Sequence, residues 1–287
     1  MKRLLAAALL VASCVAPPAV APAPSPATSP SPSPARPELL LATTTSTQDS
    51  GLLDVLVPDF EKKTGYKVKT SAVGTGAALA IGARGDADVV LVHAPSLELD
   101  FMKQGNAERR LFIMHNDFIV VGPASDPAKI KGKPVLDAFK ALAAAQAPFI
   151  SRGDNSGTDV LEKSLWRQAG ITPAKPWYIE AATGMGQTLQ IASEKAAYTI
   201  TDRATYLANK SHLQLDVLNG GDPPLLNYYH VITVSQTKFP KVNGAGANAF
   251  ADYLVHADTQ KLIASFGLDK FGQQLFFPDA GKPDPSG

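Results

Sequence analysis

Cysteine is nearly absent from this chain of 287 residues. Cys14 is the only one, so no intramolecular disulfide can form and no cysteine-based metal site is possible. The fold must therefore be stabilised by packing of its apolar residues, which make up 45% of the chain.

An excess of one charge is also missing. The 27 Lys and Arg residues nearly balance 26 Asp and Glu residues, for a net charge of +1, and no long Lys/Arg block occurs. This balance predicts no nucleic-acid partner. The sequence lacks a G-x-S-x-G elbow, a Walker A motif and an H-E-x-x-H pair, and its five histidines are scattered. We therefore predict no catalytic residues, no cofactor and no resident metal.

No hydrophobic run is long enough to span a bilayer as a helix. The apolar segment Leu4–Ala12 follows Lys2 and Arg3 and precedes Val11-Ala12-Ser13-Cys14, a run that resembles a bacterial lipobox. Residues 1–14 are therefore expected to be a lipoprotein signal peptide, with Cys14 as the only membrane anchor. The alternative is an ordinary signal peptide containing an unmodified thiol. Residues 15–37, rich in Pro, Ala and Ser, are expected to be an extended tether.

From Glu38 onward, apolar runs of strand length alternate with segments of helical spacing. This alternation predicts an α/β protein with mainly parallel sheets. We expect αL caps at Gly65, Gly105 and Gly170. The expected strands are Leu39–Ala42, Val68–Val73, Asp88–His93, Phe118–Gly122, Phe149–Ser151, Trp177–Ala181, Ala197–Thr201 and Tyr228–Val234. The expected helices are Gly51–Lys63, Ser96–Gln104, Val135–Gln146, Gly157–Ala169, Met185–Glu194, Ala204–Asn209 and a long one over Ala245–Phe266.

Two apolar stretches, Phe118–Gly122 and Tyr228–Val234, lack a helix of their own and are interpreted as crossings between two lobes. Residues 38–117 with 235–277 would then form lobe 1, and residues 118–234 would form lobe 2. The Gly- and Pro-rich tail, residues 278–287, is expected to be disordered.

Two polar segments follow apolar strands and precede helices. They are TTTSTQDSGLL at 43–53 and SRGDNSGTD at 151–159. Helix N-termini with nearby hydroxyls and an arginine favour a small oxyanion, although Ser and Thr before a helix are also common N-caps. Ligands of open α/β sheets bind beyond the carboxyl ends of strands, where both segments fall. The candidate ligands of the anion are Thr44, Thr45, Ser46, Arg152, Ser156, Gly157 and Thr158.

With further segments added, the chain resembles the TupA family, the tungstate-binding proteins of bacterial ABC importers. These segments are SAVGTGAAL at 71–79, GDADVVLVHAP at 85–95, MHNDFIVVGP at 114–123 and ATGMGQTL at 182–189. The resemblance implies a two-lobed class II periplasmic-binding-protein fold with the ligand in the interlobe cleft. It also implies an extracytoplasmic location, an ABC permease with its ATPase as partners, and tungstate or molybdate as the ligand.

The resemblance also assigns residues. Thr43 to Ser46 resemble the family's first oxyanion loop, and its arginine and downstream threonine fall on Arg152 and Thr158. Ser71 and Thr75 could add hydroxyls from lobe 1, and Thr183 or the backbone at Gly184 could add donors from lobe 2. For Met185 we expect a packing role, and for His93 a hydrogen-bonded structural role.

The main rival is a phosphate-binding protein, because SRGDNSGT also resembles the RSDGSGT run of that family. Phosphate still carries a proton near neutral pH and benefits from a carboxylate that accepts it, whereas tungstate needs donors only. Asp154 would face a bound phosphate but would turn away from tungstate, to pair with Arg152 or to cap the helix. A phosphoester hydrolase that reuses the anion cradle is the alternative from a different class.

Overall fold

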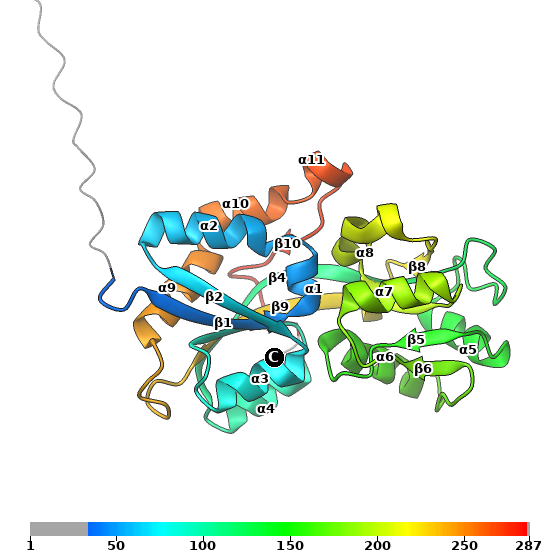
Figure 1. Ribbon diagram of the computed structural model, residues 1–287, viewed down its shortest axis with the longest axis horizontal. Helices are drawn as coiled ribbons and strands as arrows, with labels where there is room; N and C mark the ends of the chain where they lie inside the picture. Colours follow the sequence, from blue (N-terminus) through cyan, green and yellow to red (C-terminus); the bar gives the residue numbers. More distant parts are fainter. Residues whose placement is uncertain (1–33, 286–287) are drawn as a thin grey trace, which may run out of the picture. The chain divides into compact units, whose positions relative to one another are not determined.

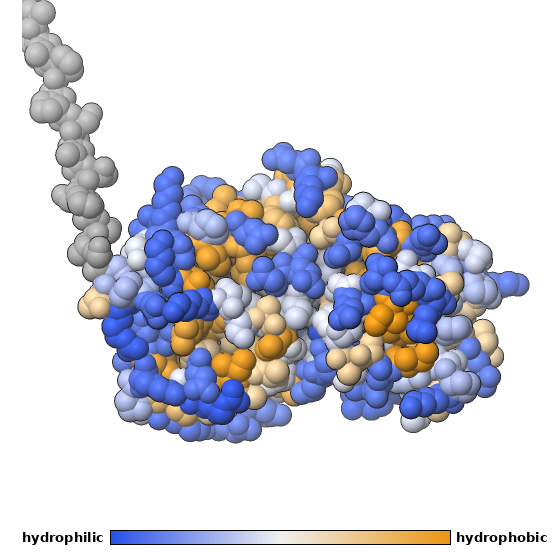
Figure 2. Space-filling view, viewed as in Figure 1, coloured by the Kyte–Doolittle hydropathy of each residue, from blue (hydrophilic) through white to orange (hydrophobic). Residues whose placement is uncertain are grey.

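The computed structural model describes residues 34–285. The predictions on the signal peptide, Cys14 and most of the tether lie outside the described residues. Within residues 34–285, no helix has both the length and the apolar character needed to cross a membrane. On the face shown in Figure 2, hydrophobic residues form separate small patches among hydrophilic ones.

Strands and helices alternate along the chain, as the sequence predicts (Figure 1). The strands are β1 (Glu38–Thr44), β2 (Lys67–Val73), β3 (Val89–Val92), β4 (Ala107–Gly122), β5 (Phe149–Ser151), β6 (Tyr178–Glu180), β7 (Thr199–Asp202), β8 (Asp216–Gly220), β9 (Leu226–Val234) and β10 (Phe277–Pro278). The helices are α1 (Thr45–Asp49), α2 (Leu53–Thr64), α3 (Thr75–Ala83), α4 (Pro95–Lys103), α5 (Val135–Ala144), α6 (Gly157–Gln168), α7 (Met185–Glu194), α8 (Arg203–Asn209), α9 (Gly244–Val255), α10 (Ala257–Ser265) and α11 (Leu268–Phe271).

Several elements differ from expectation. Helices α1 and α3 and strands β8 and β10 were not predicted, and β4 begins eleven residues before the expected strand at Phe118. The long C-terminal helix is instead two helices, because His256 has an extended ψ of 141° and its side chain accepts a hydrogen bond from the Asp258 amide to cap α10. The αL glycines are confirmed at Gly65, Gly105 and Gly170.

The main sheet is mixed, which corrects the prediction of mainly parallel sheets. Strands β1, β2 and β3 are parallel neighbours, as are β5 and β6 in a small second sheet. In contrast, β9 is antiparallel to both β3 and β4, and β7 and β8 are antiparallel to β4. The long strand β4 pairs with strands of both lobes, and each of these partners runs antiparallel to it.

The first half of β4 pairs with β9 and its last residues, Phe118–Gly122, pair with β7 and β8. Strand β9 pairs along its length with β4 or β3, so residues 226–234 lie in the sheet of lobe 1. The sequence placed them in lobe 2, up to residue 234. The lobe to which β9 belongs is set by the strands it pairs with, β3 and β4. The apolar sequence of β9 does not reveal which strands these are.

Each lobe buries apolar residues on both faces of its sheet. In β3, Val89 and Leu91 pack into one cluster with α2 and α9, while Val90 and Val92 pack into another with α3 and α4. This alternation follows from the period-two geometry of strands. Figure 1 shows α2 and α10 on one side of β1 and β2, and α3 and α4 on the other. Two further clusters in lobe 2 surround Trp166 and Met185.

The C-terminal tail, for which the sequence predicts disorder, makes specific contacts with lobe 1 as far as residue 284. Phe277 pairs with His115 of β4, and the buried Asp279 carboxylate lies 2.6 Å from Nδ1 of that histidine. Asp284 lies 2.5 Å from the Arg110 guanidinium and 3.1 Å from His230 Nε2. Hydropathy alone misses such a segment, because ion pairs hold it rather than apolar burial.

Candidate functional site

The first polar segment forms the junction between β1 and α1. Thr44 is the N-cap of α1, and its Oγ1 accepts a hydrogen bond from the Thr47 amide at 3.2 Å. The hydroxyls of Thr44 and Ser46 lie 3.0 and 3.1 Å from Nε2 of His93, which follows β3. Because β1 and β3 are parallel neighbours, their carboxyl ends bring these residues together.

His93 is a buried, neutral residue. Its Nδ1 lies 2.9 Å from Oδ1 of Asn227, which fixes the ring from the side of β9. Burial is the main cause that lowers the pKa of His93 to about 3; the positive charge of Arg152 acts in the same direction, and the Asn227 hydrogen bond opposes both. Both ring nitrogens of His93 therefore have hydrogen-bond partners, which agrees with the structural role expected for this residue.

The second polar segment is a tight loop between β5 and α6. Ser156 is the N-cap of α6 and accepts from the Asp159 amide at 3.2 Å. The Asp159 carboxylate in turn accepts from the amides of Gly153 and Asn155, each at 3.0 Å. The loop is therefore held from the first turn of its own helix, and Ser156 does serve as an ordinary N-cap.

Arg152 lies at the centre of the site and is only 2% exposed. Its Nη2 donates to Thr45 Oγ1 at 3.0 Å and lies 2.5 Å from Asp154 Oδ2, while Nε donates to the Thr183 carbonyl at 3.2 Å. Its Nη1 is buried and has no hydrogen-bond partner within the described part of the chain. The Thr158 hydroxyl, at the start of α6, is also buried and unpartnered there.

The two lobes meet closely around this site. The Gly157 amide of lobe 2 donates to Thr75 Oγ1 of lobe 1, and the Gly76 amide donates to the Asn155 carbonyl, both at 3.1 Å. A Cβ at position 157 would lie 2.6 Å from His93 Nδ1, so only glycine fits there. The glycines whose added Cβ would meet the opposite lobe within 3.5 Å are Gly74, Gly76, Gly157, Gly184 and Gly186.

The remaining predicted residues differ in their placement. Gly184, the N-cap of α7, faces Thr45 across the lobes. Thr183 contributes its carbonyl to Arg152, while its hydroxyl bonds Gln187. Met185 is fully buried in an apolar cluster, as its expected packing role requires. Ser71 is exposed on β2 opposite Ala42, outside the group of residues around Arg152.

Two interlobe contacts escaped the sequence reasoning. The Asp49 carboxylate, at the end of α1, accepts from the Gly186 amide of α7 at 3.2 Å. Thr205 of α8 donates its hydroxyl proton to the Ser46 carbonyl at 3.1 Å. Asp49 belongs to the polar segment TTTSTQD and could have been noted there, whereas nothing around Thr205 in the sequence sets it apart from other helical threonines.

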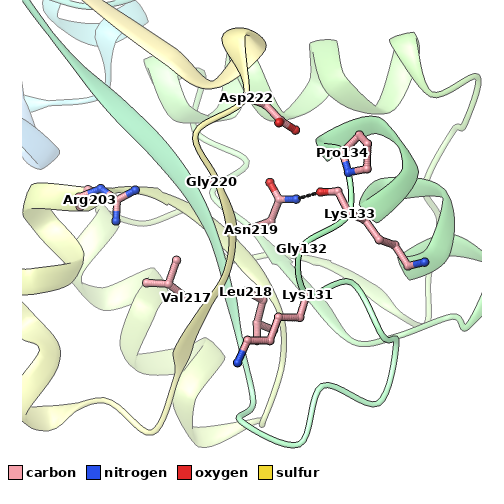
Figure 3. A pocket seen from close by; sticks show the side chains of 10 residues that line it. All are labelled: Lys131, Gly132, Lys133, Pro134, Arg203, Val217, Leu218, Asn219, Gly220 and Asp222. Carbon is pink, nitrogen blue, oxygen red and sulfur yellow. Dashed lines mark hydrogen bonds between the residues drawn. The ribbon is translucent and has the colours of Figure 1, made fainter.

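A hollow of about 480 Å³ lies on lobe 2, away from Arg152 (Figure 3). Asn219 donates its amide proton to the Lys133 carbonyl there, and the buried Asn219 Oδ1 has no partner among the described residues. The nearby Asp222 carboxylate accepts from the Val135 amide. The lining also includes Lys131, Lys133 and Arg203, and the Arg203 guanidinium lies 2.5 Å from the Asp117 carboxylate.

Comparison with known proteins identifies the superfamily to which this fold belongs. Residues 23–258 match a family described as a PBP superfamily domain. That match covers well over half of the chain, and with the two-lobed architecture it defines the protein as a member of the PBP superfamily.

More similar relatives identify the family within this superfamily. The chain is 46% identical over 251 residues to the tungstate-binding protein TupA of Peptoclostridium acidaminophilum, covering 86% of this chain and 88% of that protein. It is also similar to the structure of a tungstate ABC transporter from Geobacter sulfurreducens, with 47% identity, a TM-score of 0.75, and coverage of 80% of this chain and 98% of that one. TupA from Desulfovibrio alaskensis G20 gives 44% identity and a TM-score of 0.71, over 85% and 99% of the two chains. The chain belongs to the TupA family of tungstate-binding proteins.

Proposed function

We propose that this protein captures tungstate, with molybdate as a second ligand, and delivers it to an ABC permease and its ATPase. The observation that carries the proposal is a pair of buried donors, Arg152 Nη1 and Thr158 Oγ1, that have no partner among residues 34–285 and lie on one short segment against the opposite lobe. A buried donor without a partner costs free energy. An oxyanion between the lobes would satisfy both.

The proposed donor set is a single cation surrounded by neutral groups. Arg152 supplies the charge, and the N-terminus of α6 adds backbone amides. A hydrogen bond to a charged group contributes about 1.5–3 kcal/mol. Six or seven of them could reach the roughly −12 kcal/mol of nanomolar binding, less the cost of closure. The set we propose is Thr44, Thr45, Ser46, Thr75, Arg152, Ser156, Gly157, Thr158 and Gly184, without Ser71.

The position of Asp154 favours tungstate over phosphate. One of its carboxylate oxygens lies against Arg152 and the other accepts from the Ser156 amide at 3.1 Å. Both oxygens are therefore engaged with donors of the protein. A phosphate site would need such a carboxylate to accept the proton of the ligand. This pairing with Arg152 is the orientation expected for Asp154 in a tungstate site, and it supports tungstate over the phosphate alternative.

The hydrolase alternative has little chemical support. The relatives are binding proteins of transport systems. His93 is the histidine in contact with the site, and a pKa of about 3 makes it a poor general base at neutral pH. Incubation with a chromogenic phosphoester tests this alternative directly, and turnover that is lost in Arg152→Ala would support it.

Calorimetric titration with tungstate, molybdate, sulfate and phosphate tests the proposed ligand. We expect tungstate or molybdate to bind far more tightly than phosphate or sulfate. Phosphate carries a proton that the proposed donors cannot accept, and sulfate is a smaller dianion that would reach fewer of the donors. Phosphate as the tightest of the four would overturn the proposal and favour its rival. Tungstate and molybdate have nearly the same size and charge, so we expect the smallest difference between those two.

We also propose that the protein acts outside the cytoplasm, held to a bacterial membrane by a lipid on Cys14. The support is the lipobox-like run before a Pro-rich tether. Intact-mass analysis of protein from native membranes should show residues 1–13 removed and Cys14 acylated. A Cys14→Ala protein found on the membrane in the wild-type amount would contradict the anchor.

A further inference from the structure

Helix α7 begins without a capping side chain of its own. Its N-cap is Gly184, which offers no side-chain acceptor, so the first backbone amides of the helix need partners elsewhere. One such amide, that of Gly186, donates to Asp49 Oδ2 at 3.2 Å. Asp49 belongs to α1 in lobe 1, whereas α7 belongs to lobe 2. The cap of this helix therefore comes from across the cleft.

We propose that Asp49 is an interlobe latch, a positioning residue whose carboxylate caps α7 and so controls how fast the bound oxyanion leaves. This inference rests on the proposed function. The contact can exist only when the lobes are together. Its free energy therefore favours the closed clamp, and breaking it is part of opening.

The short helix α1 couples the latch to the anion site. Thr45 begins α1 and accepts from Arg152, while Asp49 ends it and accepts from Gly186. Between them, the Ser46 carbonyl accepts from Thr205 of α8. All three contacts join α1 to lobe 2. A ligand that draws Arg152 and Thr45 together would therefore also bring Asp49 to α7.

The spacing of the two lobes depends on glycine at the latch. A Cβ at position 186 would lie 3.2 Å from Asp49 Oδ2, and one at position 184 would lie 3.4 Å from Thr45. Gly186 thus lets the carboxylate approach the backbone amide.

The charge of the Asp49 carboxylate favours its contact with α7 over its position in α1. A carboxylate is favourable at the N-terminus of α7 and gains little at the carbonyl end of its own short helix. Partial burial raises the pKa of Asp49, against the opposing effects of the Gly186 hydrogen bond and the Arg152 charge. Asp49 is nevertheless exposed to solvent and lines a hollow of about 410 Å³ together with Asn209 and Gln187. Water can replace either partner, so the latch can break and re-form.

Replacing Asp49 tests the latch through the dissociation rate of tungstate. We compare Asp49→Ala and Asp49→Asn with the wild-type chain, using radiolabelled tungstate chased with unlabelled tungstate. A lost hydrogen bond to a partly exposed carboxylate predicts about tenfold faster dissociation for Asp49→Ala, with the association rate within about twofold. Asp49→Asn should lie between the two, because its amide oxygen can still accept from Gly186. Asp54→Ala, which removes an exposed carboxylate from the neighbouring helix α2, is the charge control and should behave as wild type.

The outcomes separate the latch from the proposed function. Wild-type protein that binds tungstate with a dissociation rate equal to that of Asp49→Ala overturns the latch and leaves the function intact. Wild-type protein that binds no tungstate overturns the function. In that case, hydrogen exchange of the Gly186 amide in ligand-free protein decides the latch. About tenfold faster exchange in Asp49→Ala than in wild type supports it, and equal exchange overturns it.

Discussion

Arg152 is the residue with the largest expected effect on binding. It is buried, and its Nη1 is a donor with no partner in residues 34–285. Removing one partner of a buried charged contact costs about 2–5 kcal/mol, so Arg152→Ala should lose about 30-fold or more in tungstate affinity. Arg152→Lys should recover only part of it, because an ammonium lacks the planar fork of donors.

Arg152 also lies against Asp154, so a purely structural role must be measured separately. Calorimetry and apo melting temperature on the same variant distinguish the two roles. Arg167→Ala, at the exposed end of α6, the helix that follows the Arg152 loop, is the control and should change neither quantity. Unchanged affinity with a lowered melting temperature would reduce Arg152 to a structural partner of Asp154.

Gly157 sets how closely the lobes can approach. In Gly157→Ala, the new methyl group would lie 2.6 Å from His93 Nδ1 and 2.7 Å from the His93 carbonyl oxygen, so the clamp could not close fully. We expect a loss of about 100-fold in affinity, since small displacements of binding groups are costly, with the apo melting temperature nearly unchanged. Gly184→Ala provides the matched comparison. Its methyl group would lie 3.4 Å from Thr45, which is an ordinary contact distance, so we expect a smaller loss. Equal losses in the two variants would argue against this steric explanation.

His93 should make stability depend on pH. Its pKa is about 3 in the folded protein against 6.5 for an ordinary histidine, so the unfolded chain binds more protons between these values. The contribution of His93 to the free energy of unfolding is therefore lost as pH falls from about 6.5, by at most about 1.4 kcal/mol per pH unit. His93→Gln lacks this titration. Urea unfolding at pH 7.5, 6 and 5 should show wild type losing stability relative to the variant, and parallel profiles would contradict the assignment.

At the scale of elements, the C-terminal segment is held to lobe 1 by charge. Glu98 Oε2 lies 2.9 Å from both Arg110 Nε and His230 Nδ1, and Asp284 reaches the same two residues from the tail. Glu98 and His230 are fully buried, whereas 23% of the Asp284 side chain is exposed. The segment carrying Asp284 therefore completes a buried cluster of charged groups that spans β4, β9 and α4.

Asp284→Asn should lower the free energy of unfolding by about 1–3 kcal/mol, less than the cost of breaking a fully buried pair because Asp284 is partly exposed. Tungstate affinity should stay within about twofold, since the segment lies outside the residues around Arg152. Chemical denaturation followed by calorimetry measures both. Asp269→Asn, in α11, serves as the charge control. An unchanged unfolding midpoint for Asp284→Asn would contradict a holding role for the tail.

At the scale of the whole molecule, a ligand shared by two lobes should stabilise both. A ligand that binds only the folded protein adds about 2.7 kcal/mol to the free energy of unfolding when its concentration is 100 times Kd. With tungstate we expect slower hydrogen exchange both in lobe 1, at α3, and in lobe 2, at α6. Protection confined to one lobe would show that the anion does not bridge them, and sulfate at the same concentration provides the control.

The sequence was most informative where chemistry is local. A cap needs a hydroxyl before a helix, and an αL turn favours glycine, so Ser156 and Gly65 could be assigned from their neighbours alone. The same holds for the polar segments that follow strand ends, which already point to Arg152 and Thr158, and the family resemblance falls on the same two residues. Alternation of apolar runs was enough to predict an α/β protein with two lobes.

Tertiary structure alone decided which groups meet across the chain. Asp49 and Gly186 are far apart in sequence, and neither has a local pattern that names the other. The same is true of Gly157 with His93, and of Asp284 with Arg110 and His230. The mixed direction of the sheet and the boundary at β9 were likewise set by pairing between distant strands. Local propensity depends on neighbours within a few residues, whereas closure, pairing and buried charge depend on contacts that exist only once the chain has folded.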